Sequence, residues 1–196
     1  MVAQLPQATF SHDIFSQALS AETPFMWIFA YGSLIFRPAF SYLERRRAFV
    51  KGWSRRFWQG SPDHRGVPDA PGCVVTLLPD PDGLCGGCAF RIDPAKSDGI
   101  LKAIDAREQA GFSRKRLALL PAPGEQPFAD GITWVAAPEN PHFLGPLQEP
   151  AIAEIISSRS GPSGSNADYA MQLFVALRNL DIVDIHVETI IRHLDN

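Results

Sequence analysis

The sequence contains no long hydrophobic run and no large excess of charge of either sign. No apolar segment approaches the roughly 20 residues that a helix needs to cross a bilayer. The first residues, MVAQLPQATFSHDIF, lack the basic start and the continuous apolar stretch of a secretory signal. A formal charge of −3 gives no general attraction to nucleic acid or to an anionic membrane surface. These absences predict a cytoplasmic protein that binds a small molecule rather than nucleic acid or membrane.

Cysteine is also scarce. Cys73, Cys85 and Cys88 cannot all be paired within one chain, so we expect free thiols in a reducing compartment. Cys85 and Cys88 have the CxxC spacing of redox and zinc sites, but Cys88 runs into the strand-like segment AFRID, whereas an activated thiol usually lies at a helix N-terminus. The five histidines are scattered and form no second compact pair. The sequence therefore predicts neither a redox site nor a metal site.

The length of 196 residues fits one domain better than two. We expect an extension over residues 1–24, with a short helix around Ile14 to Leu19, and one compact domain over residues 25–196. Segments typical of strands come first, at residues 26–30, 47–59, 73–80 and 84–93. The cluster PDPDG, residues 79–83, predicts a turn between the last two.

The second half of the sequence changes to helical spacing. A helix is expected from about Pro94 to Gln109, ended by Gly111 as a C-terminal cap. Two returning strands follow within residues 115–123 and 131–139, and three helices within 146–160, 167–180 and 181–194. GPSGSN, residues 161–166, predicts a tight loop, and it has neither the GxSxG order of a nucleophile elbow nor a phosphate-binding GK[ST].

Glu108 is a candidate for proton transfer. Ile100, Ile104 and Glu108 stand at i, i+4 and i+8, which predicts that the carboxylate belongs to the apolar face of its helix and is partly buried. Burial raises the pKa of a carboxyl group and makes it a better proton acceptor near neutral pH. The alternative is a structural ion pair with Arg107 or another arginine, and periodicity alone favours neither.

A second candidate is the break in the apolar run WIFAYGSLIF at Tyr31, Gly32 and Ser33. Glycine permits close approach of a ligand to the main chain, and successive N–H groups can hold a carboxylate or stabilise a developing negative charge. The alternative is a plain turn or bulge, which a YGS sequence alone favours.

The segments ERRRAFVK and SRRFW interleave basic and aromatic residues. On strands such residues point alternately to two faces, so we interpret them as a solvated face or an anion-binding patch rather than a nucleic-acid site. His64 and His186 have no convincing nucleophile beside them in the sequence and are interpreted as structural or surface residues.

Several segments in the same order resemble the ChaC-like family, the glutathione-specific gamma-glutamylcyclotransferases. These segments are WIFAYGSLIF, VKGWSRRFWQGSPDHRGVPDAPGCVVTLLPD, IDAREQAGF, NPHFLGP, GPSGSNADY and LRNLDIVDIHV. The resemblance covers Trp27 to His193. It implies an α+β fold built around a small, strongly bent, mixed β-barrel with surrounding helices. It also implies an enzyme without a cofactor that converts glutathione to 5-oxoproline and cysteinylglycine.

The resemblance also implies residue roles. Glu108 corresponds to the general base, and the segment that holds the gamma-glutamyl group corresponds to Ile28, Phe29, Ala30, Tyr31, Gly32, Ser33 and Leu34. The chain departs from the family at Phe36-Arg37, often tryptophan and lysine, and at Gln109 to Phe112, often Lys-Gly-Gly-Tyr. Loss of the tyrosine hydroxyl at Phe112 removes a hydrogen-bonding group near the site. The alternatives are a cyclotransferase for other gamma-glutamyl peptides or amines, and a non-catalytic gamma-glutamyl-binding protein.

Overall fold

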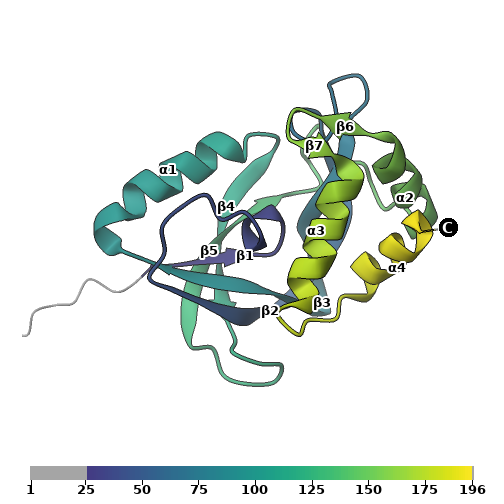
Figure 1. The fold of residues 1–196 in the computed structure, drawn as a ribbon. Helices are drawn as coiled ribbons and strands as arrows, with labels where there is room; N and C mark the ends of the chain where they lie inside the picture. The colour runs from purple at the N-terminus through teal and green to yellow at the C-terminus, as the bar shows by residue number, and fades with distance from the viewer. Residues whose placement is uncertain (1–25, 196) are drawn as a thin grey trace, which may run out of the picture.

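The computed structural model describes residues 26–195, which form an α+β fold (Figure 1). Five strands make one mixed sheet in the order β2-β3-β1-β5-β4. The strands are β1 Met26–Ala30, β2 Glu44–Ser61, β3 Gly72–Ile92, β4 Phe112–Leu119 and β5 Ala129–Ala136. The helices are η1 Ser33–Ile35, η2 Pro94–Lys96, α1 Ser97–Arg107, α2 Glu149–Ser158, α3 Asn166–Arg178 and α4 Ile185–Leu194. A small hairpin joins β6 Ser160–Gly161 to β7 Gly164–Ser165.

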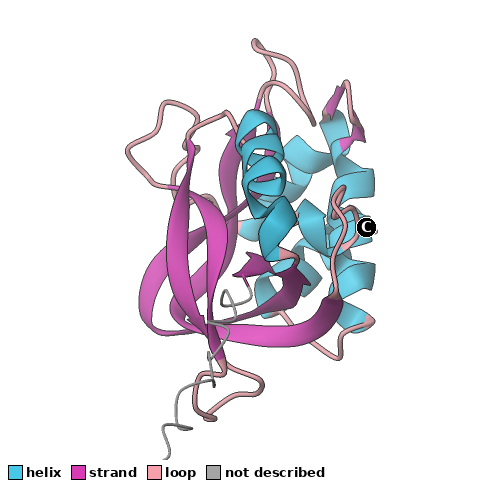
Figure 2. Ribbon diagram, turned by 90° about the vertical axis from the view of Figure 1, so that its left-hand side faces the viewer, coloured by secondary structure: helices cyan, strands magenta, loops and turns pink. Residues whose placement is uncertain are grey.

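Helices α2, α3 and α4 pack together on one face of the bent sheet (Figure 2), and α1 lies apart from them. Strand β1 is central, antiparallel to β3 and parallel to β5. Trp27 to Ala30 are all buried, which explains why this strand is a continuous apolar run rather than an alternating pattern. The predicted strand at residues 26–30 is confirmed, as are the two returning strands and the three closing helices.

The predicted turn at PDPDG is wrong. Strand β3 continues through this segment as one strand paired with β2. Lys51 pairs with Leu84 and Trp53 with Pro79, so residues 80–83 lie opposite Gly52 alone. The segment is thus a long bulge, with four residues opposite one. It accommodates Pro81, which has no N–H to donate to the ladder. Gly52 has a φ of +83°, a conformation that favours glycine.

The predicted closure into a barrel is also wrong, although the strong bending is present. Phe49 in β2 and Leu120, directly after β4, exchange two backbone hydrogen bonds of 2.9 Å. This bridge brings the two edge strands together at one point. Pro121 follows and has no N–H to extend the pairing, and the sheet stays open.

The helix that carries the DAREQAGF segment ends earlier than predicted. Its last residue is Arg107, and Glu108 is the first residue beyond it, with φ −93° and ψ 59°. The N–H of Glu108 still donates to the carbonyl of Ile104 at 2.8 Å. Gly111, with a φ of +86°, lies in the turn into β4 and does not cap the helix. Glu108 therefore does not belong to the apolar helix face, because its backbone has left the helical conformation.

The predicted extension over residues 1–24 and its short helix lie outside the described residues. Among the helices of residues 26–195, none is both long and apolar enough to span a membrane.

Candidate active site

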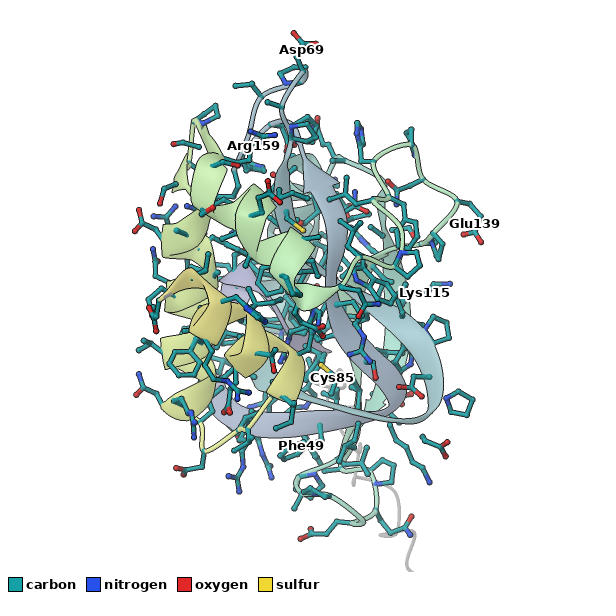
Figure 3. The ribbon with its side chains drawn as sticks, turned by 90° about the vertical axis from the view of Figure 1, so that its right-hand side faces the viewer. Phe49, Asp69, Cys85, Lys115, Glu139 and Arg159 are labelled. Atoms are coloured by element: carbon teal, nitrogen blue, oxygen red, sulfur yellow. The ribbon has the colours of Figure 1, made fainter. Side chains whose placement is uncertain are left out.

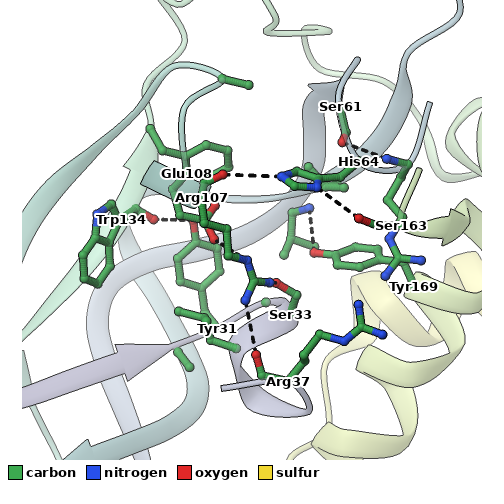
Figure 4. Close-up of a pocket in the computed structure, with 18 of the residues that line it drawn as sticks. Tyr31, Ser33, Arg37, Ser61, His64, Arg107, Glu108, Trp134, Ser163 and Tyr169 are labelled. Carbon is green, nitrogen blue, oxygen red and sulfur yellow. Dashed lines mark hydrogen bonds and ion pairs between the residues drawn. The ribbon is translucent and has the colours of Figure 1, made fainter. Parts of the chain in front are cut away.

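A cavity of about 300 Å³ opens between the end of α1, helix η1, helix α3 and the β6–β7 turn (Figure 4). Glu108 lines this cavity together with Phe29, Ala30, Tyr31, Gly32, Ser33 and Leu34. Of the predicted site residues, Ile28 alone does not line it, because its side chain is fully buried in the core. The structure thus brings the candidate base and the YGSL segment, Tyr31 to Leu34, to one cavity.

The YGSL segment forms the transition from β1 into η1. Gly32 precedes the helix, and its position is crowded: a Cβ there would lie 3.0 Å from Val75 Cγ2 and 3.3 Å from Tyr169 Oη. Because the φ of Gly32 is −128°, outside the left-handed region, the backbone conformation does not require glycine. Glycine is needed here because its neighbours leave no room for a Cβ. The first N–H groups of any helix lack acceptors within it. The break in the apolar run therefore places backbone donors at the start of η1, beside the cavity.

Arg55 holds the YGSL segment from inside the protein. It is 1% exposed, and its Nε donates to the Tyr31 carbonyl at 2.8 Å. Its other nitrogens donate to the Gly86 carbonyl and to Asp184 Oδ2, the latter at 2.6 Å. The interpretation of the SRRFW segment as a solvated or anion-binding patch is wrong for Arg55. The expected alternation is present, because Arg55 points inward and Arg56 is partly exposed.

Two tyrosine hydroxyls lie at the cavity in different settings. Tyr31 Oη donates to the Trp134 carbonyl at 2.7 Å, and Tyr169 Oη accepts from the N–H of Val75 at 3.4 Å. Burial, and then the charge of Glu108, raises the pKa of Tyr31 well above its ordinary value. Burial likewise raises the pKa of Tyr169. Both phenols are therefore neutral near pH 7 and act as hydrogen-bonding groups.

The side chain of Glu108 is 19% exposed. Burial raises the pKa of its carboxyl group, while the charges of Arg107 and His64 lower it to a smaller extent. Arg107 Nε lies 3.5 Å from Glu108 Oε1. The predicted partial burial is confirmed, and the structure also contains the ion pair with Arg107 that was the alternative. Both features occur together at this carboxylate.

Arg107 connects the candidate base to the YGSL segment. Its Nη2 donates to Ser33 Oγ, and its Nη1 donates to the Arg37 carbonyl at 3.3 Å (Figure 4). Phe36, Arg37, Gln109 and Phe112, where the chain departs from the family pattern, all line the cavity.

The sequence interpretation missed His64 and Ser163 as cavity residues. His64 Nδ1 lies 3.1 Å from Ser163 Oγ, and its Nε2 lies 3.4 Å from the Arg107 carbonyl. Ser163 N–H also donates to the His64 carbonyl at 2.9 Å. The structural interpretation of His186 is confirmed, because its Nε2 accepts from the Phe57 N–H at 3.0 Å and its Nδ1 lies 3.0 Å from Glu149 Oε1.

The three cysteines are free and buried, and Figure 3 shows Cys85 among the interior side chains. Burial raises the pKa of Cys85 to about 11 and also raises that of Cys88. Thiols protonated at neutral pH are poor nucleophiles, which argues against redox activity of the CxxC pair. Within residues 26–195, no three His, Cys, Asp or Glu side chains gather closely enough to hold a metal ion.

The chain is similar in sequence and in fold to known proteins. The sequence profile of ChaC-like proteins matches residues 26–196. Human "Glutathione-specific gamma-glutamylcyclotransferase 1" is 39% identical over 170 residues, which cover 85% of this chain and 77% of that protein. The "Glutathione-specific gamma-glutamylcyclotransferase" of Schizosaccharomyces pombe is 34% identical over 83% of this chain and 88% of its own length.

A crystal structure of a yeast gamma-glutamyl cyclotransferase specific to glutathione superposes with a TM-score of 0.81. The two sequences are 26% identical, and the match covers 87% of this chain and 96% of the yeast chain. Fold and sequence lead to the same assignment: the chain belongs to the ChaC-like family.

Proposed function

We propose that this protein is a glutathione-specific gamma-glutamylcyclotransferase, a lyase that releases 5-oxoproline and cysteinylglycine from glutathione. Two relatives over 30% identical carry this name, and each match covers more than four fifths of this chain. The observation that carries the proposal is that Glu108 and the YGSL segment line one cavity. We assign the activity to one catalytic domain over residues 25–196.

The substrate supplies its own nucleophile. The α-amino group of the gamma-glutamyl residue attacks its side-chain carbonyl carbon, a C–N bond forms, and a five-membered lactam closes. The former amide C–N bond then breaks and cysteinylglycine leaves as an amine. No oxidant, reductant or external nucleophile takes part, so the reaction needs no cofactor.

Glu108 acts as the general base in this mechanism. An α-amino group has a pKa of roughly 8, so most of it is protonated at neutral pH and cannot attack. The carboxylate of Glu108 first takes a proton from the ammonium group and releases it to solvent, which leaves a neutral amine that can attack. It then takes the second proton that this nitrogen loses on attack and passes it to the departing nitrogen, so that cysteinylglycine leaves as a neutral amine. Burial supports this role, because it raises the pKa of Glu108 toward the working pH, where a base is most effective.

The YGSL segment, with Phe29 and Ala30 beside it, binds the gamma-glutamyl group. Backbone N–H groups at the start of η1 suit an α-carboxylate or the oxygen that gains negative charge during attack. Arg107 provides a positive charge beside this segment, and its guanidinium donates a hydrogen bond to Ser33 Oγ. Ile28 supports this segment from the core and does not contact the cavity.

We further propose a cytoplasmic location. The free state of Cys73, Cys85 and Cys88 suits a reducing compartment, where glutathione is abundant in its thiol form.

The test is to incubate purified protein with reduced glutathione and to measure 5-oxoproline and cysteinylglycine by mass spectrometry. Wild type should form both in equal amounts, and Glu108→Gln should lose about 10²- to 10⁴-fold in kcat, the usual contribution of a general base. Circular dichroism should show that the variant is folded. Near-normal turnover by Glu108→Gln would remove Glu108 from the base role, and no product from the wild type would reject glutathione as the substrate.

A further inference from the structure

Arg65 is a buried cation at the cavity. It is 5% exposed, and its guanidinium carbon lies 5.4 Å from the centroid of the Tyr169 ring. Its Nη1 donates to the Ser165 carbonyl at 3.1 Å. Across the part of the chain that the structure describes, no carboxylate forms an ion pair with Arg65. The charge of Asp168 acts on Arg65, but only from beyond ion-pair distance. A buried charge without a direct partner is costly, so an anion in the cavity would stabilise Arg65.

Arg37 is a second cation on the same side of the cavity. It is exposed, and none of the ion pairs formed within residues 26–195 includes its guanidinium. Burial lowers the pKa of Arg65, the like charges of Arg37 and Arg107 lower it further, and the charge of Asp168 opposes these effects. Arg37 and Arg107 therefore both lie within electrostatic reach of Arg65. In Figure 4 the Arg37 side chain extends toward Tyr169 and away from Glu108. Arg65 lies over the Tyr169 ring, toward which Arg37 extends, and the charges that act on Glu108 are those of Arg107, His64 and Asp63 rather than of these two arginines.

Glutathione presents its charges in a matching order. At neutral pH it carries an ammonium group and a carboxylate on the gamma-glutamyl residue and a second carboxylate on glycine. The ammonium group must lie near Glu108 for proton transfer, and the glycine carboxylate is at the far end of the molecule. Among the charged residues that line the cavity, Arg37, Arg65 and Arg107 outnumber Asp63 and Glu108, which suits a substrate with one net negative charge.

We propose that Arg65 and Arg37 bind the glycine carboxylate of glutathione and thereby select glutathione over gamma-glutamyl compounds that lack a distal carboxylate. This inference rests on the proposed function, and it adds the residues that determine specificity. The planar fork of arginine can donate two parallel hydrogen bonds to a carboxylate, which gives both affinity and direction. Arg107 is left out of this assignment because it contacts Ser33 and Glu108.

The test measures kcat/KM for glutathione and for glutathione amide, in which a carboxamide replaces the glycine carboxylate. Loss of one charge-assisted interaction should make wild type prefer glutathione by about 10- to 100-fold. In Arg65→Met and in Arg37→Met this ratio should fall several-fold toward one, because the arginine that distinguishes the substrates is gone. Arg116→Met, on the exposed surface of β4, is the matched control and should keep the wild-type ratio.

The ratio of kcat/KM for glutathione to kcat/KM for glutathione amide distinguishes a role of Arg65 in substrate specificity from a purely structural role. If Arg65 served only to position Ser165 and Tyr169, its loss would lower the rates with both substrates equally, and an unchanged ratio in active variants would overturn the assignment. If Arg65→Met does not fold, Arg65→Lys and the exposed Arg37→Met carry the same test. Wild type that forms 5-oxoproline from neither substrate would overturn the proposed function and this inference together.

Discussion

Arg107 and Glu108 are adjacent in the sequence, yet their side chains meet, with Arg107 Nε 3.5 Å from Glu108 Oε1. Consecutive residues within a helix diverge by about 100° and do not face each other. The contact exists because α1 ends at Arg107 and the backbone of Glu108 leaves the helical conformation. Two effects then oppose each other, since burial raises the pKa of Glu108 and the guanidinium lowers it, and burial dominates.

Removal of the Arg107 charge should therefore change the pH dependence of turnover. In Arg107→Met the pKa of Glu108 should rise further, because the cation that favours its ionised form is absent. Catalysis by Glu108 requires the carboxylate, so the acidic limb of the kcat profile should move to higher pH. Arg107→Lys keeps the charge and should leave the limb close to that of wild type. An acidic limb that does not move in Arg107→Met would show that another group limits turnover at low pH.

Glu108 should also make the stability of the protein depend on pH. Its pKa in the folded state is raised from an ordinary value of 4.5, so the folded state binds the proton more tightly than the unfolded state. The stabilisation from its protonated form is complete below 4.5 and is lost as pH rises through the folded-state pKa. Glu108→Gln lacks this loss, so its melting temperature relative to wild type should increase as pH rises above 4.5. A difference that is constant between about pH 4 and 8 would contradict the raised pKa.

Much of the sheet could be predicted from the sequence because burial leaves a local pattern. Trp27 to Ala30 are buried on both faces of β1, and a short apolar run is what such a strand requires. The turn predicted at PDPDG was wrong because proline, aspartate and glycine are typical both of a turn and of a bulge. The difference depends on whether β2 continues alongside, and no local pattern in the segment reports that pairing.

The candidate site was predicted only in part, for a similar reason. Glu108 fits the apolar period of α1, and that period carries no signal that the helix ends one residue before it. His64 and Ser163 are 99 residues apart and meet at 3.1 Å, a contact made by the tertiary fold alone. Both lie in segments rich in glycine and proline, where turn chemistry is a sufficient local explanation for their sequence.

Arg55 should be essential for stability although it lies behind the cavity. Arg55→Met leaves Asp184 without its cation and leaves the carbonyl groups of Tyr31 and Gly86 without this donor. Breaking a buried ion pair on one side typically costs about 3–5 kcal/mol, so the free energy of unfolding in urea should fall by about that amount. Arg116→Met, an exposed substitution, should change it by less than about 0.5 kcal/mol.

The origin of that cost can be checked with a second substitution. Asp184 Oδ1 accepts the N–H of Val187 at the start of α4, a capping role that asparagine can retain. Arg55→Met/Asp184→Asn should therefore recover part of the lost stability, because no unpaired carboxylate remains. A double variant no more stable than Arg55→Met would assign the cost to the two carbonyl groups instead.

Gly32→Ala should lower both stability and activity by a steric effect. The added Cβ would lie 3.0 Å from Val75 Cγ2 and 3.3 Å from Tyr169 Oη, so the YGSL segment or its neighbours must move. Overpacking of this kind typically costs about 1–3 kcal/mol, and displacement of the η1 amides should lower kcat/KM beyond any loss of folded protein. In a Val75→Ala background the nearest obstructing methyl is absent, so the same glycine substitution should cost less in both stability and kcat/KM. Equal costs in the two backgrounds would show that Tyr169 rather than Val75 limits which side chains this position tolerates. A fully active Gly32→Ala would show that turnover does not depend on the exact path of the YGSL backbone.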